Sequence, residues 1–174
     1  MNELIDKYLD KHACHLKRAR EYFENLSTSE VVLKAALSVN EDSKMFPHQY
    51  RVGKAKTELA ANKLMQFETE ILAAQSFEDI FKYTEEVRKM KIGVGHLWSY
   101  DTALHIGFNL GLLPNEVYIQ SGVKRGLKKF FKDIQFKRKI DKRELIGLEV
   151  LEPYEIENFL CVMSKTNKNN KICV

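Results

Sequence analysis

The chain has 174 residues, of which 44% are hydrophobic and 30% charged, and its formal net charge is +4 at pH 7. This balance is too apolar and too weakly charged for an intrinsically disordered protein, and no apolar run approaches the roughly 20 residues that span a bilayer. The three cysteines show no CxxC spacing, which argues against a disulfide framework and a cysteine zinc site. We therefore expect a soluble globular protein of one domain, over residues 1–163.

Helical patterns dominate the first half of the chain, because helix formers are frequent and only 3 prolines and 8 glycines interrupt them. Residues 3–25 place apolar side chains at three- and four-residue intervals, which predicts an amphipathic helix. A second helix is expected to start at a cap within 27–29 and to end near Asn40. A connector is expected over 40–50. Two further helices of this half are expected over 51–74 and 76–90.

Glycine and proline punctuate the second half more often. Lys91–Gly95 predicts a tight turn, and residues 97–112 predict a helix closed by a glycine and a proline. A helix is expected to follow Gly122 as far as Phe131, and a last one to cover 154–163. The domain is thus expected to comprise N-terminal helices (1–90), a hairpin with a basic helix (91–130), C-terminal helices (131–163) and a flexible tail (164–174).

The turn at 91–95 reads KIGVG and lies between two helical patterns. A pair of glycines lets the backbone turn sharply and leaves the peptide amides unobstructed. The start of the following helix adds a partial positive charge to those amides, which favours an anion. The pattern predicts that the amides of Gly93 and Gly95 hold a phosphate.

Residues 77–130 resemble the helix-hairpin-helix region of base-excision DNA glycosylases. The resemblance rests on the Gly93-Val94-Gly95 turn, on a following helix that contains Ala103 and Leu104, and on the segment VYIQSGVKRGL at 117–127. It implies a mainly α fold, a compact multi-helix domain with a helix-hairpin-helix-like element, and DNA binding. The sequence around YDTAL (100–104) also resembles a family of uncharacterised bacterial proteins.

Two positions depart from the glycosylase pattern. Gln120 stands where the family has its catalytic aspartate, and an amide can neither act as a general base nor offer a carboxylate to an oxocarbenium-like centre. The lysine nucleophile of the bifunctional members has no counterpart in residues 96–99. We therefore expect no intact glycosylase chemistry and assign no catalytic residue.

Basic residues are concentrated between Lys124 and Arg143, where ten Lys or Arg and two Asp give a local charge of +8. Such a patch fits a polyanion, although a solvated lysine surface is the alternative. Residues 137–143 extend the same field. Helical spacing is expected to turn Leu127, Phe130 and Phe131 inward and to place on one face Lys124, Arg125, Lys128, Lys129 and Lys132.

Several other polar and aromatic residues admit both a functional and a structural interpretation. Trp98 and Tyr100 can contact a base or can belong to the core, and His48 with Tyr50 can line a groove or pack within its loop. Asp101 and His105 lie four residues apart on one helical face. They can share a proton in a functional site, or they can form a buried hydrogen bond. Without another ligand at compatible spacing, we expect no metal at His12, Cys14 and His15.

The sequence thus predicts a nucleic-acid-binding protein, with DNA as the first choice, that contacts phosphates without sequence specificity. A protein–protein interaction module is the alternative, and an enzyme using Tyr100, Asp101 and His105 is the third. We expect no cofactor, no metal and no membrane partner, and a cytoplasmic location, because the N-terminus lacks the pattern of a secretory signal. The predicted contacts are Gly93, Gly95, Trp98, Tyr100, Lys124, Arg125, Lys128 and Lys129.

Overall fold

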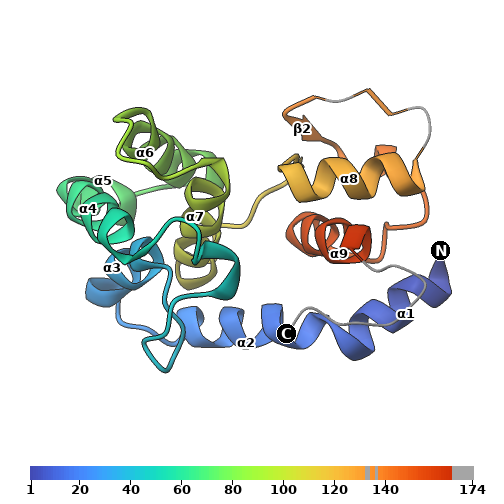
Figure 1. The fold of residues 1–174 in the computed structure, drawn as a ribbon, viewed down its shortest axis with the longest axis horizontal. Coiled ribbons are helices and arrows are strands. Elements are labelled where there is room, and N and C mark those ends of the chain that lie inside the picture. The colour runs from blue at the N-terminus through green and yellow to red at the C-terminus, as the bar shows by residue number, and fades with distance from the viewer. Residues whose placement is uncertain (132–133, 136, 166–174) are drawn as a thin grey trace. The chain divides into compact units, whose positions relative to one another are not determined.

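The computed structural model describes residues 1–131, 134–135 and 137–165, and it confirms a mainly α-helical fold (Figure 1). Contacts divide the chain into two compact units. Unit 1 combines Met1–Lys17 with Asn115–Val174, and unit 2 is Arg18–Pro114. The single domain expected over 1–163 stays a prediction. None of the helices in the described part of the chain has the length and apolar character of a membrane span.

Several predicted boundaries were wrong. The helix expected over 3–25 is two helices, α1 (Asn2–Lys11) and α2 (Ala13–Glu24), which are interrupted at His12, where φ is −128°. The last helix, α9 (Pro153–Lys165), continues two residues beyond the predicted end, so the start of the predicted flexible tail is helical. The rest of that tail lies outside the described residues.

Unit 2 is built from short helices around one long one. The helix expected over 51–74 is broken into three segments, because a 3₁₀ turn interrupts the α-helical hydrogen bonds. Its elements, besides the end of α2, are α3 (Thr28–Leu37), η1 (Pro47–Gln49), α4 (Lys54–Leu64), η2 (Met65–Phe67), α5 (Glu68–Leu72), α6 (Phe77–Lys89) and α7 (His96–Leu110).

Helix α7 is the buried centre of unit 2, and its polar side chains complete the ends of two other helices. Trp98 Nε1 donates to the carbonyl oxygen of Ala36 over 2.9 Å, in the last turn of α3. Asn109 Nδ2 donates to the carbonyl oxygens of Phe23 and Leu26 at the end of α2, over 2.9 and 2.8 Å. Carbonyls in a last helical turn have no partner within the helix, so these bonds satisfy groups that burial would otherwise penalise.

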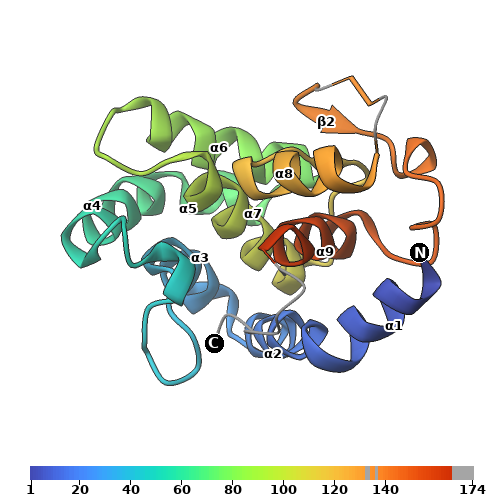
Figure 2. The same cartoon turned by 45° about the vertical axis from the view of Figure 1, so that its right-hand side comes forward.

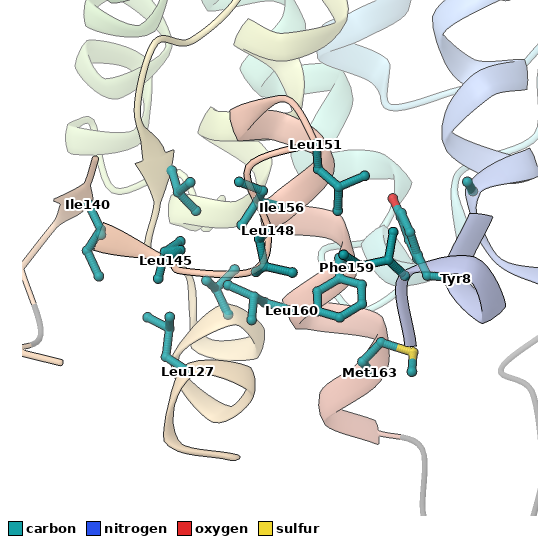
Figure 3. Packing of buried hydrophobic residues seen from close by; sticks show 14 residues of the cluster. Tyr8, Leu127, Ile140, Leu145, Leu148, Leu151, Ile156, Phe159, Leu160 and Met163 are labelled. Carbon is teal, nitrogen blue, oxygen red and sulfur yellow. The ribbon is translucent and has the colours of Figure 1, made fainter. Parts of the chain in front are cut away.

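Unit 1 packs α1, α8 (Ser121–Phe130) and α9 around its own core (Figures 1 and 2). The strands β1 (Val117–Tyr118) and β2 (Lys139–Ile140) pair antiparallel, and η3 (Lys142–Glu144) follows. Figure 3 shows Phe159 among the buried apolar side chains, where its ring meets that of Tyr8 edge to face at 5.4 Å. The core also includes Ile5, Val117, Val123, Leu127, Ile140, Leu145, Leu148, Leu151, Ile156, Leu160 and Met163.

Candidate nucleic-acid interface

Helix α8 separates its apolar and charged residues onto two faces. At about 100° per residue, its four cations cover an arc of about 140°. All four side chains are exposed, whereas the opposite face is buried against the unit 1 core. The exposed cations are Lys124, Arg125, Lys128 and Lys129, and the buried residues are Gly122, Val123, Gly126 and Leu127.

Two glycines set how closely α8 lies against α9. A Cβ at Gly126 would overlap the backbone carbonyl of Leu160, and a Cβ at Gly122 would overlap the sulfur of Cys161. The backbone of α8 therefore lies against the backbone of α9 at Gly126 and against the side chain of Cys161 at Gly122. Because α9 belongs to the core, this contact fixes the direction in which the cationic face of α8 points.

The two aromatic residues expected to anchor the basic helix do so only in part. Phe130 and Phe131 are half-buried and pack against the core cluster, and the rings of Phe130 and Phe159 are 5.9 Å apart. Lys129 Nζ donates to the carbonyl oxygen of Met163 over 2.8 Å, near the end of α9. Lys129 therefore also holds the two helices together. Lys132, expected on the same face, lies outside the described residues.

In the segment 137–143, which we call the basic ridge, four of the five cations are paired with carboxylates. Lys139 Nζ lies 2.5 Å from Glu116, and Arg143 lies 2.5 Å from Asp141. The ammonium groups of Lys142 and Lys137 lie 3.7 and 3.8 Å from the carboxylates of Glu152 and Glu144, respectively. Because three of these acids lie outside the window 124–143, the local charge of +8 overstates the field at the ridge.

The glycine turn has the expected backbone but mixed electrostatic surroundings. Gly93 has a φ of +94°, which favours glycine, and Gly95 is extended immediately before α7. The side chain of Lys56 covers the turn, because a Cβ on Gly93 would lie 2.8 Å from its Cδ. A cation therefore accompanies the amides.

A carboxylate lies beside the first turn of α7. Glu85 Oε1 is 2.7 Å from Arg88 Nε and 3.3 Å from His96 Nδ1. Burial alone would raise the pKa of Glu85, but hydrogen bonds from Arg88 and Ser99 and the charges of Arg88 and His96 hold it below its usual value. An ionised carboxylate opposes the binding of a phosphate at this helix start.

The predicted contacts fall in different units. Gly93 and Gly95 belong to unit 2, whereas the four cations of α8 belong to unit 1. We therefore consider the turn and the basic helix separately. The exposed face of α8 carries four cations, whereas the turn has both a cation, Lys56, and a carboxylate, Glu85, beside it.

Trp98 and Tyr100 are core residues, which corrects the expectation that they contact a base. Their exposed fractions are 0% and 1%, and the ring of Tyr100 lies 5.9 Å from that of Phe77. A buried ring offers no face to a stacking base. The bond from Trp98 to α3 explains why an indole occupies this position.

Asp101 bonds to the connector instead of to His105. His48 Nε2 and Gln49 Nε2 lie 3.0 and 2.6 Å from Asp101 Oδ2, so the carboxylate fastens the connector to α7. Sequence alone gave no signal for this contact, because it joins residues more than 50 positions apart. Tyr50, for which a groove with His48 and packing within the loop were both open, is 63% exposed.

His105 is buried in an aromatic cluster. Its ring stacks on Phe23 at 4.2 Å and lies 5.1 Å from the ring of Phe46. Burial lowers the pKa of His105 to about 4, the charge of Asp101 raises it, and that of His48 lowers it further. At neutral pH the ring is uncharged. Tyr100 and His105 are buried, and Asp101 is bonded to His48 and Gln49, so the three side chains do not converge on an exposed surface.

Comparison with protein-family models, with curated proteins and with solved structures found no match. The resemblance to DNA glycosylases therefore stays a prediction from the sequence.

Proposed function

We propose that this chain binds nucleic acid through its phosphates, without reading the base sequence, and that the exposed face of α8 is the contact surface. The observation that carries the proposal is the separation of four exposed cations from a buried glycine and apolar face on one short helix. Lysine and arginine contacts to phosphate supply affinity and little sequence information.

The packing of α8 supports this function. The helix lies against the backbone of α9 at Gly126 and against the side chain of Cys161 at Gly122, so its cationic side is held in a fixed orientation. The exposed positions of α8 are Ser121 and the four cations, and none of them is an Asn or Gln of the kind that pairs with adenine. Phosphate contacts are the interaction such a face makes best.

The test is fluorescence anisotropy with a short labelled DNA duplex and with single-stranded DNA and RNA at low salt. The variant is Lys124→Glu/Arg125→Glu/Lys128→Glu, which leaves the structural bond of Lys129 in place. We expect binding by the native chain and a loss of at least 100-fold in the variant, because three attractive contacts become repulsive.

The matched control is Lys11→Glu/Lys17→Glu/Arg18→Glu, which removes the same total charge from exposed positions of α1 and α2. Reversal there should cost much less affinity. Equal losses in both variants, with both folded by circular dichroism, would mean that only net charge matters and that α8 is not the site.

A protein partner remains the second candidate, because one loop of unit 1 exposes apolar side chains. Ile146 and Val150 are 78% and 76% exposed between buried leucines. An exposed helix rich in aromatic residues would favour a partner interface. Among the described residues, however, Tyr50 is the only aromatic one of the large exposed hydrophobic side chains. Nucleic acid is therefore the better supported function.

A further inference from the structure

The basic ridge lies in the same unit as α8, and four of its five cations already have anionic partners. Figures 1 and 2 both show β2 beside α8. Three lysines of the ridge pair with glutamates that come from other segments of unit 1: Lys139 with Glu116, Lys142 with Glu152 and Lys137 with Glu144.

These pairs are partly or largely accessible to solvent. The side chains of Lys137 and Glu144 are 59% and 48% exposed, whereas those of Lys139 and Glu116 are 32% and 39% exposed. Ion pairs at such positions contribute little to stability, because water and salt screen them and long side chains lose entropy when they pair. A lysine in such a pair can therefore exchange its carboxylate for another anion at small cost.

The fourth pair of the ridge differs from these three. Asp141 accepts a hydrogen bond from the backbone N–H of Arg143 as well as from its guanidinium, so it also shapes the start of η3. We leave Asp141 unchanged in the test for that reason, since its removal would alter the backbone.

We propose that the basic ridge is a second phosphate-binding surface of the nucleic-acid site, and that Glu116, Glu144 and Glu152 compete with the bound strand for its lysines. The inference rests on the proposed function of α8. The glutamates act as internal competitors, which keep the ridge neutral until a phosphate chain displaces them. The ligand of the ridge is the same nucleic-acid strand that contacts α8. The ridge extends the surface of unit 1 that this strand contacts.

The experiment compares two variants that each add three positive charges to the net charge. One is Glu116→Gln/Glu144→Gln/Glu152→Gln, and the other is the matched control on the exposed side of α1, Glu3→Gln/Asp6→Asn/Asp10→Asn. Binding of labelled single-stranded and duplex DNA is measured by anisotropy across a salt series. We expect the ridge variant to bind on the order of tenfold more tightly than the control, since the cost of breaking three exposed pairs disappears.

The ridge lysines are tested by their removal. Adding Lys137→Ala/Lys139→Ala/Lys142→Ala to the ridge variant should cancel its gain in affinity. It should also make the slope of log K against log salt on duplex DNA shallower by about 2.7, since three phosphate contacts are lost. Equal affinity in the ridge variant and the α1 control, or an unchanged slope after removal of the three lysines, would overturn the inference.

This outcome is distinguishable from failure of the proposed function. If reversal of the α8 cations leaves affinity unchanged, the proposed function fails. If that reversal abolishes binding while the ridge variant behaves like its control, α8 is the site and the ridge takes no part in it.

Discussion

Acidification should destabilise unit 2 through His105. The ring is buried between Phe23 and Phe46, and its pKa falls from 6.5 to about 4 in the folded protein. The unfolded chain therefore binds an additional proton between about pH 6.5 and pH 4. The stabilisation is complete above pH 6.5, is lost progressively as the pH falls from 6.5 to about 4, and is absent below pH 4.

The magnitude follows from the shift. A difference of about 2.5 pH units at about 1.36 kcal/mol each gives a loss of about 3 kcal/mol below pH 4, of which about 2 kcal/mol is already lost at pH 5. That is a large share of the 5–15 kcal/mol that stabilises a typical domain.

Urea unfolding followed by tryptophan fluorescence measures this loss directly, because Trp98 is the only tryptophan and is buried in the same unit. The native chain is compared at pH 7.5 and pH 5 with His105→Gln and with the control His15→Gln, at an exposed histidine. The pH dependence should shrink by about 2 kcal/mol in His105→Gln and stay unchanged in His15→Gln. The same pH dependence in all three chains would refute the reasoning.

Three further substitutions test the packing. Gly126→Ala should lower the stability of unit 1 by about 1–2 kcal/mol in urea unfolding followed by circular dichroism, because overlap with the backbone of Leu160 outweighs the gain in helix propensity; a more stable protein would contradict the close packing of α8 on α9. Asn109→Ala should cost about 1–3 kcal/mol, since it removes the amide that serves two carbonyls at the end of α2, and an unchanged urea midpoint would exclude that role. Lys129→Met should lower the melting temperature and weaken DNA binding less than Lys128→Met does; the reverse order in affinity would assign Lys129 to the interface instead of to the end of α9.

Local patterns in the sequence were sufficient for the helical fold and for the amphipathic character of α8. Periodicity reports which residues share a face, so it correctly placed Leu127 inside and Lys124 outside. It did not reveal the break at His12, because the apolar spacing continues through that position into α2. Boundaries set by tertiary packing are invisible to a one-dimensional pattern.

Contacts between distant segments account for the remaining errors. Trp98 was a candidate for a base contact because an indole next to polar residues fits a pocket, but its partner is a carbonyl 62 residues earlier. Likewise, a count of charges over 124–143 cannot include Glu116 and Glu152, which pair with that window only after folding. The sequence located the cations, and the structure shows which of them meet carboxylates.

The most direct measurement of the central claim is the salt dependence of duplex DNA binding by the native chain and by Lys124→Glu/Arg125→Glu/Lys128→Glu. Three phosphate contacts, made by Lys124, Arg125 and Lys128, contribute about −2.7 to the slope of log K against log salt, so affinity should fall at least about 40-fold between 50 and 200 mM salt. The account predicts at least this slope in the native chain and a loss of at least 100-fold in affinity in the variant. No binding by the native chain at 50 mM salt, or the same affinity and slope in the variant, would contradict it.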